Sequence, residues 1–328
     1  MGECEGSRRG ACCGRIVITG ASGFIGSHLV PALVGAGFEI SCILEPGAEN
    51  PFVGVQTYSA DICTTRGLSE ALTGAKAVVH LAARNHVLKE TAKDPLSEYR
   101  RVNVEGTRNV IRAAREQGVG LFVHLSSIKA VGEGTGEILD ETAPCLPSTP
   151  YGISKLESEE VVRAEADGTG MTVVIFRLPM VYGPGNKGNL PRMIRWADRG
   201  LPFPLVQPDN LRSMVYVGNV VAGVLVVLES LWSRKATQGT YIVKDESDYS
   251  TRMIYSSICR ELGKASRFIP LPAVLGRFAG AISEDFRKVT SSFRVSSAKI
   301  REEIGFVPPF SAEEGSARTV EWYKRSAR

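Results

Sequence analysis

The sequence predicts a doubly wound α/β fold, in which helices cover both faces of a parallel sheet. The first observation is local: the β-branched run at 16–18 precedes three glycines, and apolar residues at helical spacing follow them. The second is repetition, because buried-strand patterns alternate with helical patterns as far as residue 177. Strands that alternate with helices form a parallel sheet with right-handed crossovers.

The three glycines have the spacing of a dinucleotide-binding fingerprint. Glycine lets the backbone turn tightly and approach a pyrophosphate, whose charge then lies at the N-terminus of the next helix. The alternative is an ordinary strand-to-helix turn, but the flanking strand and helix give the context of a Rossmann-type fold. The residues expected to bind NAD here are Gly20, Gly23, Phe24, Ile25 and Gly26.

A second, smaller α/β domain is expected after this sheet. The length of 328 residues suggests about two domains. Beyond residue 177 the alternation loosens and Pro and Gly cluster, as in loops that shape a pocket. We therefore expect an NAD-binding Rossmann domain over 15–177 and a substrate-binding domain over 178–328, from which part of 213–245 could return to the first sheet.

Acidic and small residues after the next strands indicate where the rest of NAD binds. Glu45 ends the strand expected over 39–44, where a carboxylate commonly takes the ribose hydroxyls and repels a 2′-phosphate; the alternative is a solvated turn residue. After the following strand, Asp61, beside Ile62, could bond the adenine amino group. The strand expected over 77–83 ends in small residues that leave room for a ligand. The residues expected to line that room are Leu81, Ala82 and Ala83.

Tyr151 and Lys155 lie four residues apart at the start of a helix expected over 151–165, so both project from one face. A tyrosine has an ordinary pKa of about 10 and is a poor base at neutral pH, whereas a nearby lysine ammonium lowers that pKa. Ser127, just past a strand end, could hold a substrate hydroxyl or carbonyl against the tyrosine. These residues predict an acid–base centre that moves a proton while a nicotinamide takes or gives a hydride.

The remaining elements follow from apolar spacing and from turn residues. In chain order we expect a helix over 102–111, strands over 121–125 and 172–176, and then helix and strand pieces over 190–200, 217–228, 241–244, 251–262 and 297–304. The last helix opens with a capping box, in which Ser311 and Glu314 satisfy each other's backbone N–H group.

Composition favours a soluble protein that binds neither nucleic acid nor a membrane. The net charge of +4 is small, and no block of lysine and arginine stands out. The longest strongly apolar run, 220–228, is far shorter than the roughly 20 residues of a membrane span. Residues 1–14 lack the apolar core of a signal peptide, so we expect a disordered leader and a cytoplasmic location. The seven scattered cysteines are expected to be reduced thiols, and no metal site is expected.

Several short segments, in order from residue 15 nearly to the end of the chain, match one family. They are TGASGFIG (19–26), DI (61–62), HLAA (80–83), NVEGT (103–107), SS (126–127), PYGISK (150–155), RLPMVYGP (177–184), SAKIR (297–301) and GFVP (305–308). On these segments the chain resembles the extended short-chain dehydrogenase/reductases, in particular their nucleotide-sugar epimerase/dehydratase branch.

The resemblance implies the roles of the central residues. Ser127, Tyr151 and Lys155 would form the catalytic triad, and Lys155 would also hold the nicotinamide ribose. Asn103 would support the hydrogen-bond network of the active site. The choice of serine stays open, because the distance to Gly132 favours Ser127 and counting back from Tyr151 favours the preceding Ser126.

Substrate contacts are implied in the same way. Asn189 matches the segment that contacts the nucleotide part of a sugar nucleotide, and Arg212 matches the arginine that binds its diphosphate. A guanidinium suits phosphate oxygens because it can donate to two of them at once; the alternative is a surface arginine. A second phosphate-binding arginine is open between Arg287 and Arg294. Met180 stands where the epimerases best known for UDP-galactose have a phosphate-contacting asparagine.

The leading interpretation is an NAD-dependent enzyme that acts at C4 of a nucleotide-activated sugar, similar to 4-epimerases of UDP-hexoses or UDP-N-acetylhexosamines. The alternatives are a 4-ketosugar or other ketone reductase of the same family, and a non-catalytic dinucleotide-binding regulator. Sugar 4,6-dehydratases carry an Asp–Glu pair directly after the serine or threonine, where this chain has Ile128 and Lys129, so we do not expect dehydration. We also expect a homodimer.

Overall fold

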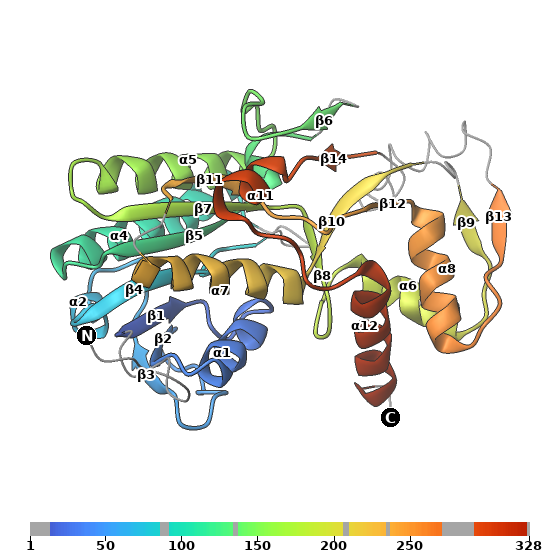
Figure 1. The fold of residues 1–328 in the computed structure, drawn as a ribbon, viewed down its shortest axis with the longest axis horizontal. Coiled ribbons are helices and arrows are strands. Elements are labelled where there is room, and N and C mark those ends of the chain that lie inside the picture. The colour runs from blue at the N-terminus through green and yellow to red at the C-terminus, as the bar shows by residue number, and fades with distance from the viewer. Residues whose placement is uncertain are drawn as a thin grey trace.

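The computed structural model describes residues 14–85, 92–133, 137–205, 210–233, 237–270 and 292–326. Within these ranges the chain forms two lobes, a larger one built on a seven-stranded sheet and a smaller one of helices and short strands (Figure 1). Most of the expected leader and the candidate Arg287 lie outside the described residues.

The predicted parallel sheet is confirmed. Its strand order is β11-β7-β5-β4-β1-β2-β3, and every neighbouring pair is parallel. The order reverses between β1 and β4, and ligands of such sheets bind at the carboxyl ends of the strands beside that reversal. The strands are β1 (Arg15–Thr19), β2 (Ile40–Leu44), β3 (Gln56–Ser59), β4 (Ala75–His80), β5 (Leu121–Ser127), β7 (Thr172–Leu178) and β11 (Gly239–Ile242).

Helices cover both faces of the sheet, as the apolar runs predict. On β1, Ile16 and Ile18 pack into one core cluster and Val17 into the other, and all three side chains are fully buried. The first cluster includes α1 (Gly26–Gly35) and α7 (Val217–Ser233). The second includes α2 (Leu68–Leu72), α4 (Thr107–Glu116) and α5 (Pro150–Ala166), on the opposite face (Figure 1). A strand buried on both faces needs a continuous apolar run rather than an alternating one.

Several expected boundaries differ from those in the structure. The strand expected over 77–83 ends at His80, since the chain leaves the sheet after the N–H group of Leu81 bonds the carbonyl oxygen of Thr19. The strand expected over 121–125 runs on through Ser127, because its last residues pair with β7. The first half of the helix expected over 102–111 is a π-helical turn, η1 (Arg101–Gly106), which follows α3 (Pro95–Arg100) and leads into α4.

The smaller lobe is organised around a three-stranded sheet. Its strands are β8 (Met180–Tyr182), β10 (Arg212–Tyr216) and β12 (Asp248–Tyr249), and its main helices are α6 (Asn189–Asp198), α8 (Thr251–Leu262) and α12 (Ala312–Ser326). The buried carboxylate of Asp245 joins the strands, because it accepts hydrogen bonds from the Tyr182 and Tyr249 hydroxyls and from the Tyr216 N–H group.

Shorter elements complete the described chain. They are the 3₁₀ turn η2 (Ile128–Ala130), β6 (Ile138–Leu139), β9 (Phe203–Leu205), β13 (Phe268–Pro270), β14 (Arg294–Val295) and α11 (Ala298–Ile304). The capping box expected for the last helix is confirmed, with N–H to side-chain oxygen distances of 2.9 and 3.3 Å between Ser311 and Glu314. Every helix in the part of the chain that the structure describes is too short or too polar to cross a membrane.

Candidate active site

The glycine turn after β1 packs so closely that side chains are excluded from it. Gly20 has a φ angle of +69°, and a Cβ atom there would lie 2.6 Å from the backbone nitrogen of Ala82. A Cβ atom on Gly26 would overlap the carbonyl group of Ala21. The turn thus holds bare backbone against the loop after β4, at the N-terminus of α1. This geometry fits a pyrophosphate group, which needs close backbone approach and N–H donors.

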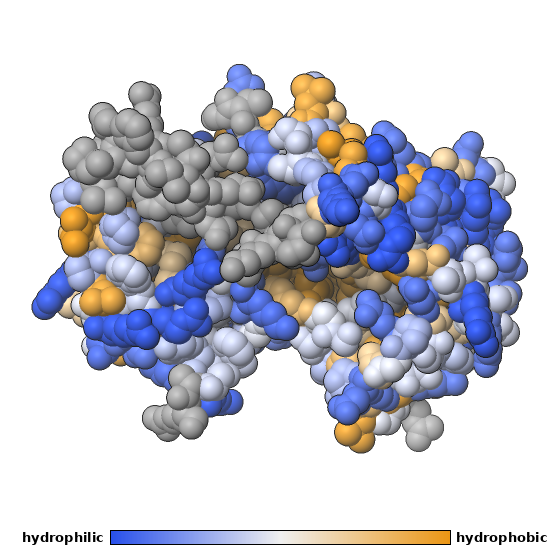
Figure 2. Space-filling view, turned by 180° about the vertical axis from the view of Figure 1, so that it is seen from behind, coloured by the Kyte–Doolittle hydropathy of each residue, from blue (hydrophilic) through white to orange (hydrophobic). Residues whose placement is uncertain are grey.

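A cavity of about 210 Å³ lies beside this turn. Figure 2 shows the molecule hollowed between its two lobes, with apolar residues at the bottom of the hollow. The sequence-predicted residues that line the cavity are Gly20, Gly23, Phe24, Ile25, Gly26, Leu81, Ala83, Ser127, Tyr151 and Lys155. Ala82 instead bonds the Thr19 hydroxyl through its N–H group. The cavity therefore brings the fingerprint together with the tyrosine and the lysine.

The two acidic residues expected near the adenosine lie after neighbouring strands. Glu45 is exposed directly after β2. Asp61 follows β3, and one of its carboxylate oxygens accepts a 2.9 Å hydrogen bond from the N–H group of Cys63. Ile62 is buried beside Gly106, where a Cβ atom would lie 2.9 Å from the Ile62 side chain. Both carboxylates thus lie near the carboxyl ends of β2 and β3, the two strands that extend the sheet on one side of β1.

Tyr151, Lys155 and Ser127 come together where α5 crosses the end of β5. The helix starts at a Thr149 cap, whose hydroxyl accepts a 3.2 Å hydrogen bond from the N–H group of Gly152. Tyr151 is half-buried and lines the cavity at the glycine turn together with Ser127. Lys155 is only 2% exposed, and its ammonium donates a 2.8 Å hydrogen bond to the carbonyl oxygen of Leu125. Three groups that can hold or move a proton therefore lie at one cavity.

The expectation that Lys155 lowers the pKa of Tyr151 is wrong for this structure. Burial raises the pKa of Tyr151, opposed by the hydrogen bond from Ser127. Burial also lowers the pKa of Lys155 to about 8, opposed by the charge of Glu159. Burial is the largest cause of the raised pKa of Tyr151, while the Lys155 ammonium is bonded to the Leu125 carbonyl.

The two neighbouring serines point to different partners. Successive side chains of a strand face opposite ways. Ser126 is buried, and its hydroxyl donates a 2.6 Å hydrogen bond to the carboxylate of Glu159. The Ser127 hydroxyl instead accepts a 3.2 Å hydrogen bond from the N–H group of Lys129, and Ser127 lines both cavities together with Tyr151. This geometry favours Ser127 where the sequence left the choice open.

Asn103 is buried under the loop that follows β4 and holds that loop in place. Its amide oxygen accepts a 2.7 Å hydrogen bond from the N–H group of Arg84, and its amide nitrogen donates to the Arg84 carbonyl at 3.1 Å. The same nitrogen donates to the Ser154 hydroxyl at 2.9 Å. Ser154 in turn donates to the carbonyl oxygen of Tyr151. Asn103 thereby connects the loop after β4 with the first turn of α5.

A second cavity, of about 250 Å³, extends from the tyrosine into the smaller lobe. Ser127 and Tyr151 lie on its wall together with Asn189 and Arg212, the two residues expected to contact a sugar nucleotide, and with Met180. Burial lowers the pKa of Arg212, opposed by the charge of Glu133. Arg294, a candidate for the second phosphate-binding arginine, donates a 2.9 Å hydrogen bond to Asp248. The second cavity unites the expected substrate residues with the acid–base residues.

An ion pair lines the same cavity just after Ser127. Lys129 lies 2.5 Å from the carboxylate of Glu133, and its ammonium is 5.7 Å from the centre of the Phe293 ring. Ile128 is buried in a small apolar cluster that also contains Phe293. Phe293 was not anticipated, because it lies far along the chain in a segment without a recognisable pattern.

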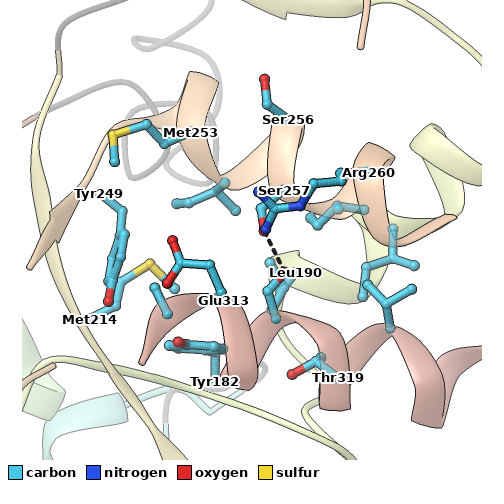
Figure 3. Close-up of a pocket in the computed structure, with 16 residues that line it drawn as sticks. Tyr182, Leu190, Met214, Tyr249, Met253, Ser256, Ser257, Arg260, Glu313 and Thr319 are labelled. Carbon is cyan, nitrogen blue, oxygen red and sulfur yellow. Dashed lines mark hydrogen bonds between the residues drawn. The ribbon is translucent and has the colours of Figure 1, made fainter. Parts of the chain in front are cut away.

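A third cavity, of about 380 Å³, lies between α6, α8 and α12. Figure 3 shows Leu190, Met214 and Met253 around it, with Arg260 and Glu313 nearby. It shares Leu190 and Ile254 with the second cavity, but none of the sequence-predicted site residues lines it.

A buried ion pair that was not predicted lies beneath the acid–base residues. Glu159 is fully buried on α5, and Arg177 of β7, only 4% exposed, donates three hydrogen bonds of 2.7 to 3.2 Å to its carboxylate. The available signal was the spacing, since Glu159 lies four residues after Lys155 and so on the same helix face.

Comparison with known proteins identifies the family. Residues 16–242 match the model of the NAD dependent epimerase/dehydratase family. The chain belongs to this family. It is 32% identical to a UDP-glucose 4-epimerase of Vibrio cholerae, across 93% of this chain and 94% of the relative. It is 28% identical to an N-acetyl-alpha-D-glucosaminyl-diphospho-ditrans,octacis-undecaprenol 4-epimerase of Escherichia coli O157:H7, across 94% of both chains.

A solved structure supports the same assignment. It is the UDP-glucose 4-epimerase of Thermus thermophilus in complex with NAD, with a TM-score of 0.75 and 26% identity. The match covers 94% of this chain and 99% of that one. The family is one of NAD-dependent enzymes, as the glycine turn and its cavity predict.

Proposed function

We propose that this chain is a 4-epimerase of a nucleotide-activated sugar, a UDP-hexose or a UDP-N-acetylhexosamine. One observation carries the proposal: Ser127 and Tyr151 line both the cavity at the glycine turn and the cavity that holds Arg212 and Asn189. An acid–base pair between a cofactor cavity and a substrate cavity is the arrangement that oxidation and reduction of a sugar carbon require. The 4-epimerase relatives support the same reaction.

Residues of the first cavity would hold NAD. The pyrophosphate would lie on the turn around Gly20 and Gly23, and the adenosine ribose beside Glu45. Lys155 would hold the nicotinamide ribose. Bound NAD supplies an acceptor and donor of hydride. The close packing of Gly20 and Gly26 against backbone atoms supports this placement, because it leaves the turn without side chains.

Tyr151 would exchange a proton with the C4 hydroxyl of the sugar. Ser127, which lines both cavities together with Tyr151, would hold that oxygen against the phenol. The buried ammonium of Lys155 adds a positive charge close to the site, and its hydrogen bond to Leu125 fixes its position. Tyr151 must act as both acceptor and donor, since epimerisation removes the proton of the C4 hydroxyl and returns it.

Residues of the smaller lobe would bind the nucleotide. Arg212, half-buried at the start of β10, would donate to the diphosphate, and Asn189, the first residue of α6, would contact the nucleotide part. Burial strengthens such a charge-assisted contact, because less water competes for the phosphate oxygens.

The protein would act in the cytoplasm as a homodimer, which sedimentation of the purified chain would test.

The experiment needs only the purified protein and two substrates. UDP-glucose and UDP-N-acetylglucosamine are incubated separately without added NAD, and the nucleotide sugars are separated by anion-exchange chromatography. We expect at least one to convert to its galacto epimer, and mass spectrometry of the denatured protein to release NAD at close to one equivalent. Protein that retains NAD but converts neither UDP-sugar would contradict the proposal.

A further inference from the structure

The carboxylate of Glu159 is the centre of a buried network that the proposed reaction does not itself use. Glu159 is fully buried, and it lies one helical turn after Lys155 on α5. Four donor groups meet on it: the Ser126 hydroxyl, the Nε and Nη2 atoms of Arg177, and Nη2 of Arg163. A carboxylate held this completely is fixed in position, because each of its oxygens already accepts hydrogen bonds.

The network holds the end of β5 beside the first cavity, which Ser126 itself lines. Ser126 donates to Glu159 at 2.6 Å, and Arg177 pairs with Ser126 across β5 and β7. The side chain of the next residue, Ser127, faces the other way and lines both cavities together with Tyr151. Fixing the Ser126 side chain therefore fixes the direction in which Ser127 points.

The same carboxylate acts on Lys155 through its charge. Burial lowers the pKa of Lys155, and the charge of Glu159 opposes that effect. Other groups face the lysine from β4 and β5, namely His80 and His124, and burial lowers the pKa of both so that they are uncharged at neutral pH. Tyr151 faces it from its own helix, and Arg177 is paired with Glu159. Among the described residues, Glu159 is the carboxylate that acts on Lys155.

We propose that Glu159 is a positioning residue for the reaction: through Ser126 it aims Ser127 at Tyr151, and through its charge it keeps Lys155 an ammonium. The inference rests on the proposed function for the roles of Tyr151 and Lys155. Arg177 is part of this arrangement, because its charge neutralises the Glu159 carboxylate, which could not otherwise stay ionised inside the protein. Burial raises the pKa of Glu159, but the bonds of Arg177 and Ser126 hold it below its usual range.

The first test measures Lys155 directly and needs no substrate. Protein is labelled with ¹³C at lysine Cε, the Lys155 signal is assigned by its loss in Lys155→Met, and its chemical shift is followed against pH. We expect Glu159→Gln to move the Lys155 titration to lower pH, and Glu159→Asp, which keeps the charge, to restore most of it. An unmoved titration in folded Glu159→Gln would overturn the electrostatic part of the proposal.

Glu165→Gln is the matched control. Glu165 lies on the same helix, is largely buried, and is held by Arg108, Arg112 and Arg115. Its loss should lower stability toward urea while the Lys155 titration stays as in the wild type. If Glu159→Gln and Glu165→Gln differ from the wild type in stability alone, Glu159 is only structural and the proposal fails.

The second test uses turnover. In Ser126→Ala, which leaves the buried ion pair in place, we expect kcat to fall by about 10- to 100-fold with little change in KM, since a small misplacement of a reacting group has that effect. An unchanged kcat in Ser126→Ala would overturn the claim that Ser126 sets the direction of the Ser127 side chain. This variant tests that claim even if Glu159→Gln does not fold. If the wild type converts no UDP-sugar, the proposed function fails, while the Lys155 titration still decides whether Glu159 controls its charge.

Discussion

The ammonium of Lys155 donates a 2.8 Å hydrogen bond to the carbonyl oxygen of Leu125, two residues before Ser127. The bond joins α5 to β5 beneath the acid–base residues. It also holds a cation at a place that is 2% exposed, and burial there lowers the pKa of Lys155 to about 8. A buried cation with a lowered pKa makes folding depend on pH.

Stability should rise with pH because of Lys155. In the unfolded chain a lysine has a pKa of about 10.4, above the folded value of about 8. Between these values the unfolded state binds more protons, so the free energy of unfolding increases with pH; below pH 8 both states are protonated and the burial penalty is complete. Urea unfolding of the wild type and of Lys155→Met at pH 7 and pH 9.5 would measure this. From pH 7 to pH 9.5 the free energy of unfolding of the wild type should increase relative to that of Lys155→Met. A relative decrease would contradict the lowered pKa of Lys155.

Tyr151→Phe should remove nearly all turnover and leave NAD bound. The hydroxyl is needed for proton transfer, and such groups typically contribute about 10²–10⁴-fold. Tyr323→Phe is the control, because its hydroxyl donates to Asp198 on the surface of the smaller lobe, away from both site cavities. Single-turnover and steady-state rates would be compared with the NAD content of each protein. A Tyr151→Phe enzyme with more than about a tenth of the wild-type rate would show that the tyrosine is not the proton carrier.

Arg212→Ala should weaken the binding of UDP and UDP-sugars without changing NAD affinity. A charge-assisted contact to a diphosphate contributes roughly 1.5–3 kcal/mol, or about 10- to 150-fold in affinity. Arg260→Ala is the matched control, since this arginine lines the separate cavity between the helices of the smaller lobe (Figure 3). Calorimetric titration with UDP would give both affinities. Equal UDP affinity in the wild type and Arg212→Ala would assign Arg212 a structural role.

The enzyme should prefer NAD to NADP by more than about tenfold, which corresponds to about 1.4 kcal/mol. Glu45 is exposed directly after β2, where its carboxylate would meet a 2′-phosphate. Fluorescence titration of apoprotein with both cofactors would measure the preference. In Glu45→Gln the preference should shrink, because the repulsive charge is gone. Tighter binding of NADP by the wild type would refute the prediction.

The sequence was sufficient for features that depend on neighbouring residues. The apolar run of β1 is continuous because Ile16 and Val17 face different helix layers, and this continuity identifies a parallel strand. The spacing of Tyr151 and Lys155 places them on one helix face, and the structure has them there.

Features that depend on distant partners were not predictable from local pattern. Glu159 and Arg177 meet across a helix and a strand, and the four-residue spacing of Glu159 from Lys155 does not identify Arg177 as its partner. The direction of the Lys155 ammonium was also missed, because the carbonyl it bonds belongs to another element. Phe293 approaches Lys129 from a segment far along the chain, so their contact could only be seen in the fold.

Dehydration of the sugar is not expected, because Ile128 and Lys129 stand where the dehydratases carry an Asp–Glu pair. Loss of water from C5 and C6 requires a base for the C5 proton and an acid for the departing oxygen. Ile128 is buried and carries no proton to transfer. Lys129 and Glu133 form an ion pair on the wall of the second cavity, so Glu133 is the carboxylate that dehydration would have to use.

Proton NMR of UDP-glucose, UDP-N-acetylglucosamine and dTDP-glucose, each incubated with the purified protein, tests the central claim most directly. Epimerisation at C4 would appear as a growing galacto anomeric signal beside the gluco signal, reaching the same ratio from either epimer. The Tyr151→Phe protein would show neither change. A new C6 methyl doublet together with a 4-keto sugar would contradict the account.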